Sequence, residues 1–411
     1  MTAIPSTPEQ FRLRSVVVSA YGPTVLEAMG YGAAIPLVPL LARELGASVG
    51  TAAFVAGLMG IGQLVMSLPA GTFIARVGER RAMAIAAGVG TVAALAASRA
   101  AHLGVLAVTA VLTGMTWSIF LLARQGFMID AVPAQLRARA LSALGGSHRI
   151  GMFAGPILAA PVVGTFGVRA AFVFAAGMSL LALALVLRVP DLGESARAAA
   201  RADPASTWAV LGRHRRALLT VGLGAAGLSG LRAARMSVLA LWGDHLGLRP
   251  AQISLLVAVG ALLEIAFFYP AGWAMDRRGR AFVAVPTATL LGAGLMLLPL
   301  TTGFTSMLLV TLFMAVGNGM GSGVVMTLGA DTAPQLHRAK YLGGWRLLGD
   351  LGFAGGPVVL SVGSTLAGLA AASLATGAGG LAVAAWLAIW VGRLDRSRRA
   401  ATGSSDEIIP A

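Results

Sequence analysis

Cysteine is absent from this chain, which excludes disulfide bonds and thiolate metal sites. Histidine occurs only five times and without the spacing of metal ligands, so we expect neither a metal nor a cofactor. No G-x4-G-K-S/T segment is present, which excludes an ATP-driven pump formed by this chain alone. The chain also lacks a nucleophile–base pair and room for a soluble domain, which argues against a membrane-embedded enzyme or sensor.

Charged residues are scarce, at 11% of the chain, whereas a soluble domain usually carries about a quarter. Hydrophobic residues make up 57% and the mean hydropathy is +0.81. At about 20 apolar residues per bilayer crossing, about twelve helices fit in the chain, which predicts an all-α membrane protein. We expect transmembrane helices near residues 15–41, 51–72, 83–101, 104–129, 140–163, 169–189, 217–242, 251–273, 282–301, 305–330, 341–363 and 369–392.

The net charge of +15 is unevenly distributed along the chain. Most basic residues fall in segments predicted on one side of the membrane, and only Arg43, Arg99, Arg169 and Arg249 fall on the other. Basic residues avoid translocation, so both termini are predicted to be cytoplasmic, and no nucleic-acid binding is expected. One of the 31 basic residues is lysine and the rest are arginine, which points to a GC-rich bacterial genome and a bacterial inner membrane.

The chain repeats itself with an offset of 201 residues. PAGTFIARVGERR begins at Pro69 and PAGWAMDRRGRAF begins at Pro270, and 270 − 69 = 201. Internal repetition in a membrane protein is typical of transporters in which two bundles rock about a site between them. The same offset pairs Gly71 with Gly272, Arg76 with Arg277, Gly78 with Gly279, Asp130 with Asp331, Pro133 with Pro334, Arg137 with Arg338, Gly151 with Gly352, Gly155 with Gly356, and Pro156 with Pro357.

The repeat predicts two pseudo-symmetric six-helix bundles, at residues 1–189 and 217–392. Residues 190–216 break the apolar pattern and are predicted to be a partly helical cytoplasmic linker. The tail at 393–411 is basic at first and then has the composition of a disordered segment. We expect the protein to act as a monomer, with the lipid bilayer, protons and a small molecule as its partners.

The hairpin pattern G-x-x-x-D/A-R-x-G, present at Gly71 and again at Gly272, resembles the cytoplasmic signature of the major facilitator superfamily. The segment GMFAGP at 151–156 is similar to the antiporter signature of the drug-export branch of that superfamily. LEAMGYGAAIPLVP at 26–39 resembles the first helix of twelve-helix drug:proton antiporters such as the tetracycline exporters. The resemblance implies a major facilitator fold.

In that family the hairpins latch an inner gate, and each residue type here has a physical reason. Gly71 and Gly272 permit close helix approach, and Gly78 and Gly279 allow positive φ. Their arginines can bond helix C-terminal carbonyls and the acids at 130 and 331. Ala75 stands where the family usually has Asp. The alternative to a gating role is that each hairpin is a basic loop that only sets the topology of the helices in the membrane. The predicted gating residues are Gly71, Arg76, Gly78, Asp130, Arg137, Gly151, Gly155, Pro156, Gly272, Asp276, Arg277, Gly279, Asp331, Arg338 and Asp350.

The Gly-x3-Gly-Pro elements at 151–156 and 352–357 have two interpretations of equal weight. Small residues three to four apart make a smooth face for close packing, and proline bends a helix. The family instead uses this element as a hinge surface between the bundles.

Charged residues inside the membrane are the sharpest signal, because each costs at least about 2.5–3.5 kcal/mol at the bilayer centre. Glu27 lies near mid-depth and is the leading candidate for a proton carrier, since desolvation of a carboxyl favours its protonated form. The alternative is a structural carboxyl paired with an arginine. Arg232 and Arg235 share a helix face, and Glu264 is the expected partner of one of them. The predicted proton and substrate cavity comprises Glu27, Tyr31, Trp117, Arg124, Arg232, Arg235, Glu264 and Asn318.

The sequence therefore predicts proton-coupled export (antiport) of a small amphipathic drug or metabolite by alternating access. The alternative is proton-coupled uptake (symport) of an organic anion or a sugar-like nutrient, which the excess of intramembrane arginine over acid keeps open.

Overall fold

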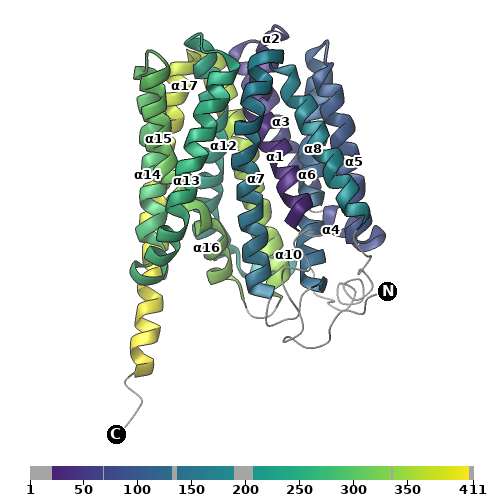
Figure 1. The fold of residues 1–411 in the computed structure, drawn as a ribbon. Coiled ribbons are helices and arrows are strands. Elements are labelled where there is room, and N and C mark those ends of the chain that lie inside the picture. Colours follow the sequence, from purple (N-terminus) through teal and green to yellow (C-terminus); the bar gives the residue numbers. More distant parts are fainter. Residues whose placement is uncertain (1–20, 68, 132–136, 189–206, 335–336, 407–411) are drawn as a thin grey trace. The chain divides into compact units, whose positions relative to one another are not determined.

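The computed structural model describes residues 21–67, 69–131, 137–188, 207–334 and 337–406, and within these ranges its regular secondary structure is entirely helical (Figure 1). Eleven of the described helical stretches are long and apolar enough to cross a membrane. The helices are α1 (Gly22–Ala34), α2 (Val38–Glu44), α3 (Val49–Ser67), α4 (Pro69–Val77), α5 (Glu79–Ser98), α6 (Leu103–Ala131), α7 (Arg137–Phe166), α8 (Arg169–Leu187), α10 (Thr207–Arg213), α11 (Arg215–Ala217), α12 (Leu223–His245), α13 (Pro250–Arg278), α14 (Ala281–Leu297), α15 (Phe304–Met320), α16 (Val324–Thr332) and α17 (Arg338–Asp406).

The longest element, α17, contains two membrane helices in one continuous stretch. Gly368 has φ +83° and ψ 164°, a non-helical conformation that only glycine adopts easily, and it separates the two. Counting α17 twice brings the eleven stretches to twelve crossings, so the predicted all-α fold with about twelve membrane helices is confirmed.

Two predicted helices contain 3-10 turns, which their apolar patterns did not predict. The first contains a 3-10 turn at Ile35–Leu37, where two prolines remove backbone donors. The tenth is divided into α15 and α16 by a 3-10 turn at Gly321–Gly323 in a glycine-rich stretch.

The tail at 393–411, whose composition predicts a basic and then a disordered segment, is helical as far as Asp406, where α17 ends. This end of α17 extends beyond the other helices of its unit (Figure 1). The side chain of Asp395 accepts a hydrogen bond from the backbone nitrogen of Ala281 at 2.8 Å, so this end is fixed to the start of α14. α10 lies within the predicted linker at 190–216, and residues 190–206 lie outside the described part of the chain, so the linker stays a prediction.

Contacts divide the chain into two compact units. Unit 1 comprises Met1–Pro204 with Leu239–Ala258, and unit 2 comprises Ala205–Val238 with Val259–Ala411. The end of α12 and the start of α13 thus pack with α1–α8. Arg43 in α2 forms an ion pair with Asp244 in that α12 end, with 3.2 Å between Nε and Oδ2.

In both units a glycine-faced helix packs directly on backbone. A Cβ added at Gly151 or Gly155 of α7 would collide with the α1 carbonyls of Val25 and Met29. In unit 2, a Cβ added at Gly352 or Gly356 of α17 would likewise collide with the α12 carbonyls of Ala226 and Gly230. Close packing within each unit therefore accounts for the Gly-x3-Gly-Pro elements, and their predicted role as a hinge remains untested.

We expect Gly151→Ala to destabilise the protein by about 1–3 kcal/mol, because the new methyl group has no room against α1. Gly145→Ala in the same helix is the matched control, since a Cβ there would meet no described atom within 4 Å. That control is expected to be neutral or slightly stabilising, because alanine favours helix over glycine. Chemical denaturation of the two variants in one detergent measures the difference, and equal stabilities would contradict the packing argument.

Two other glycines do not have the predicted role. A Cβ added at Gly71 or at Gly272 would find no described heavy atom within 4 Å. The prediction that these residues permit close helix approach is therefore wrong for this structure, because each lies on a face with no close neighbour. Gly78 and Gly279 do adopt positive φ, at 88° and 99°, as predicted for the hairpins.

Candidate functional site

Unit 1 encloses a cavity around Glu27, between α1, α3, α5, α6 and α8. The volume of this cavity is about 50 Å³, which suffices for a few water molecules. Oε1 of Glu27 accepts a hydrogen bond of 2.6 Å from the hydroxyl of Ser179 in α8. Of the residues that line this cavity in the described part of the chain, Glu27 is the only one with a charged side chain.

One wall of the cavity is aromatic. The rings of Tyr31 in α1 and Trp117 in α6 are stacked, with centroids 4.1 Å apart and an interplanar angle of 3°. Nε2 of Gln63 in α3 donates a 2.6 Å hydrogen bond to the Tyr31 hydroxyl. Glycines bring the backbones of α3 and α6 together here, since a Cβ at Gly62 or Gly114 would collide with the backbone of the other helix.

The threonines of α6 add hydrogen-bond acceptors to the cavity. The hydroxyls of Thr109, Thr113 and Thr116 each donate to a carbonyl of their own helix, at 2.8–3.0 Å. Because each hydroxyl hydrogen is used inside the helix, the remaining lone pairs can only accept. The cavity therefore presents one carboxyl group and several acceptors beside a flat aromatic surface.

Unit 2 holds a charged cluster at its corresponding helices. Nη2 of Arg235 in α12 lies 2.7 Å from Oε1 of Glu264 in α13, and the two side chains are 5% and 20% exposed. Nδ2 of Asn318 in α15 donates to the other carboxylate oxygen of Glu264 at 2.7 Å. The prediction that Glu264 pairs with one of the two α12 arginines is confirmed. The other, Arg232, packs its guanidinium against the backbone at Gly321.

The two clusters occupy equivalent positions of the repeat. Adding 201 to 31, 63 and 117 gives 232, 264 and 318. Tyr31, Gln63 and Trp117 in unit 1 thus correspond to Arg232, Glu264 and Asn318 in unit 2. The fold brings the equivalent three helices together in each unit. All three residues are neutral in unit 1, whereas two of the three, Arg232 and Glu264, are charged in unit 2.

Arg124, which was predicted to belong to the cavity, is buried in α6 but is not among the residues that line it. His148 in α7 does not line the cavity either, and its ring centroid lies 5.4 Å from that of Trp117. Neither residue therefore contributes to the surface that faces Glu27.

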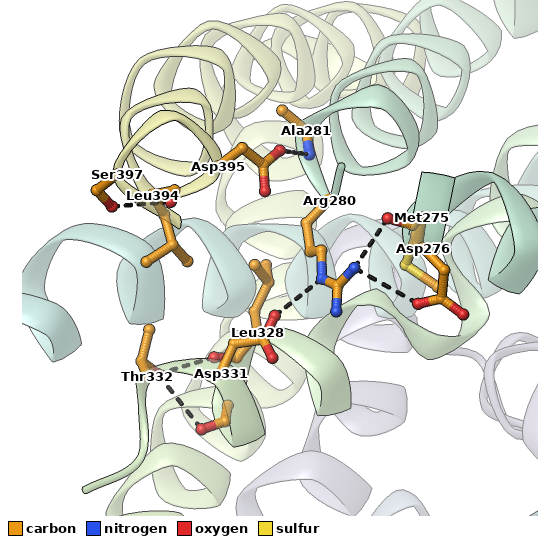
Figure 2. A network of polar contacts seen from close by, with 11 residues as sticks. Met275, Asp276, Arg280, Ala281, Leu328, Asp331, Thr332, Leu394, Asp395 and Ser397 are labelled. Carbon is orange, nitrogen blue, oxygen red and sulfur yellow. Dashed lines mark hydrogen bonds and ion pairs between the residues drawn. The ribbon is translucent and has the colours of Figure 1, made fainter. Parts of the chain in front are cut away.

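A network of polar contacts in unit 2 surrounds Arg280 (Figure 2). Its Nε lies 2.9 Å from Oδ2 of Asp331, and its Nη1 donates to the Met275 carbonyl at 2.8 Å and approaches Asp276 Oδ1 at 3.5 Å. In the same view the carboxylate of Asp395 meets the start of α14. The arginine therefore joins the end of α13 to the end of α16.

The sequence predicts that a hairpin arginine contacts Asp331, and Arg280 makes this contact. The guanidinium of Arg277, which is also a predicted gating residue, lies 4.4 Å from the ring centroid of Trp273. In unit 1, Arg80 rather than Arg76 reaches helix C-terminal carbonyls, at Val186 and Leu187 of α8. Arg76 is exposed in the last turn of α4. In each hairpin an arginine after the positive-φ glycine forms the contact, because that glycine turns the chain back toward the bundle.

The remaining gating candidates are only partly described. Asp350 pairs with Arg346 one turn earlier in α17, at 3.8 Å. Pro156 lies inside α7. The side chains of Asp130, Arg137 and Arg338 lie outside the described part of the chain, so their predicted roles stay predictions.

Sequence reasoning missed four residues that hold these sites together: Ser179, Gln63, Arg280 and Asp395. Ser179 carried a signal, because it is the one polar residue of α8 after Arg169. Gln63 was noticed only as the counterpart of Glu264. Arg280 lies within the repeated hairpin, but the choice among neighbouring arginines depends on the turn geometry.

Comparisons with known proteins agree with this fold. A family model described as Major Facilitator Superfamily matches residues 24–241 and 221–409. No curated protein sequence matches significantly.

Three solved structures illustrate the similarity. A POT family transporter in complex with 5-aminolevulinic acid has a TM-score of 0.77 and 14% identity, covering 95% of this chain and 99% of its own. A nucleoside transporter has a TM-score of 0.73 at 13% identity, covering 92% and 100%. A D-xylose-proton symporter has a TM-score of 0.71 at 15% identity, covering 92% and 97%. The TM-scores show that these proteins share the fold of this chain, and at such low sequence identity the likeness shows the fold alone.

Proposed function

Because this chain belongs to the Major Facilitator Superfamily and is a multi-pass secondary transporter, we propose that it takes up a small, negatively charged or zwitterionic organic solute together with protons. In this proposal it acts in a bacterial cytoplasmic membrane, with both termini in the cytoplasm. The skewed distribution of its basic residues supports that topology.

The observation that carries this proposal is that the titratable carboxyl and the charged cluster lie in different units. Glu27 is hydrogen-bonded to Ser179 within unit 1, and it lines a cavity without any other charged side chain among the described residues. Arg235, Glu264 and Asn318 contact one another within unit 2. A proton and a charged solute therefore need not compete for one group, and co-transport follows from loading both.

The substrate charge follows from the charge balance of unit 2. At the mid-depth positions of α12 and α13, two arginines accompany one carboxylate, which leaves one excess positive charge. The net positive charge of these side chains favours an anionic group of a solute over a cationic one near them. One proton moving down 100 mV supplies about 2.3 kcal/mol for accumulation.

Fold neighbours support uptake over export, because they include a peptide transporter, a nucleoside transporter and a D-xylose-proton symporter. Export in exchange for protons is the second candidate. The aromatic wall of Tyr31 and Trp117 beside Glu27 favours it, since a cationic amphipathic compound could compete with the proton for that carboxyl.

Flux into proteoliposomes with an imposed inward proton gradient tests the proposal. We expect one class in a labelled panel of anionic, zwitterionic, neutral and cationic solutes to accumulate, and that class to carry a negative group. A dye inside the vesicles should report acidification when this solute is added, and a protonophore should abolish accumulation. Gradient-driven expulsion of a cationic compound would favour the second candidate, and absence of coupled flux for all classes would refute both.

A further inference from the structure

We propose that Ser179 is a positioning residue that sets the proton affinity of Glu27 and transmits its protonation state to α5. The inference rests on the proposed function, in which Glu27 carries the coupled proton. Ser179 connects three helices, because its hydroxyl lies within hydrogen-bond distance of Glu27 in α1 and of the Ala87 carbonyl in α5.

The two distances are unequal. Ser179 Oγ lies 2.6 Å from Glu27 Oε1 and 3.2 Å from the Ala87 oxygen. The shorter value lies in the range of a hydroxyl that donates to a carboxylate. A serine hydroxyl has one hydrogen, so it donates fully to one of these acceptors at a time. In this structure the hydrogen is therefore directed at Glu27.

The Ala87 carbonyl is already occupied when Ser179 turns to Glu27. As a helix carbonyl it accepts the backbone N–H of Thr91, and the Thr91 hydroxyl also donates to it at 2.9 Å. A carbonyl oxygen has two lone pairs, so a third donor must compete with the Thr91 hydroxyl. Glu27 is therefore the preferred acceptor as long as it is charged.

Protonation of Glu27 reverses this preference. The new carboxyl O–H can donate to Ser179 Oγ, and the serine hydrogen can then turn to the Ala87 carbonyl, the other acceptor described at Ser179. That donation displaces the Thr91 hydroxyl. A proton on α1 thus changes the hydrogen bonds of α5 without any movement of charge between the helices.

Gly90 of α5 leaves room beside Ser179 for the serine hydroxyl to rotate. A Cβ added at Gly90 would lie 3.2 Å from Ser179 Oγ and 3.7 Å from Thr116 Oγ1. Besides Glu27, the charged or titratable residues of α1, α3, α5, α6, α7 and α8 are Tyr31, Glu79, Arg80, Arg81, Arg124, Asp130, Arg137, Arg139, His148, Arg149 and Arg169. Of those whose side chains the structure describes, only Tyr31 lines the cavity with Glu27.

Infrared difference spectroscopy of the full-length protein in lipid tests this inference. The C=O band of protonated Glu27, identified by its loss in Glu27→Gln, is followed between about pH 5 and about pH 9, where a desolvated carboxyl titrates. Ser179→Ala removes the donor to the charged form, so the midpoint should rise by about one pH unit. Ser179→Thr keeps a hydroxyl and should leave the midpoint near that of the wild type.

A second pair of variants tests the hydrogen bond between Ser179 and Glu27 without altering Ser179 itself. Gly90→Ala places a methyl group against the serine hydroxyl and should raise the midpoint, by less than Ser179→Ala. Gly88→Ala in the same helix is the matched control, because its Cβ would meet only a leucine methyl group at 3.9 Å.

The outcomes separate the two hypotheses. A shift in Ser179→Ala and Gly90→Ala, absent in Ser179→Thr and Gly88→Ala, supports the inference. A titrating band whose midpoint is the same in all variants overturns it and leaves Glu27 as the proton carrier. Absence of any titrating Glu27 band overturns the inference together with the proton site of the proposed function.

Discussion

Glu27→Gln is expected to abolish proton-driven accumulation of the solute while leaving its downhill exchange intact. Glutamine has nearly the shape of glutamic acid and can keep a hydrogen bond to Ser179, but it cannot take up or release a proton. Loss of a positioned proton-transfer group should reduce coupled flux by at least about 100-fold. Exchange of labelled for unlabelled solute should fall by less than about threefold, since no net proton movement is needed for it.

The control for Glu27→Gln is a variant that removes a carboxyl group outside the cavity. Glu44 is exposed at the end of α2, so Glu44→Gln should transport like the wild type. Solute accumulation and counterflow are measured in the same proteoliposomes for all three proteins. Normal accumulation by Glu27→Gln would remove this residue from the coupling mechanism. Loss of both activities would indicate a structural role instead.

Glu264→Met is expected to produce the largest loss of stability, about 3–5 kcal/mol, because it leaves Arg235 buried without its carboxylate. Asn318 loses an acceptor in the same variant. Replacing both members of the pair, as in Arg235→Met with Glu264→Met, should recover most of the loss. A buried pair exchanged for apolar residues of similar volume is often neutral.

The ion pair Arg43–Asp244 is the control, since its side chains are 37% and 40% exposed. Asp244→Asn should change the free energy of unfolding by at most about 1 kcal/mol, as solvent screens such pairs. Denaturation of the four proteins in one detergent gives the comparison. A single variant Glu264→Met as stable as Asp244→Asn would show that Arg235 is hydrated, contrary to the burial described above.

The sequence alone predicted a feature correctly where only a few residues could meet a physical requirement. Apolar runs have to become membrane helices, and the scarcity of acids left Glu264 as the expected partner for an α12 arginine. Stacking of Tyr31 on Trp117 brings two predicted cavity residues together. The roles assigned to these residues in transport still await the experiments above.

Contacts that depend on side-chain direction were out of reach. Arg277 and Arg280 lie in one hairpin with similar composition, and only the turn at Gly279 decides which of them faces Asp331. The predicted close approach at Gly71 failed for a related reason. Periodicity shows that a glycine lies on a helix, but not whether another helix lies against it.

The charge difference between the two equivalent clusters has a consequence for how the chain enters the bilayer. During synthesis Gln63 adds no ionised group to α3 and Tyr31 adds none to α1, where a proton can neutralise the carboxyl of Glu27. Arg235 or Glu264 alone would cost at least about 2.5–3.5 kcal/mol at the bilayer centre. Since α12 and α13 follow each other directly and their side chains are in contact, they can leave the translocon as one neutralised hairpin. Biogenesis of the second half therefore requires that these two helices pair before they meet lipid.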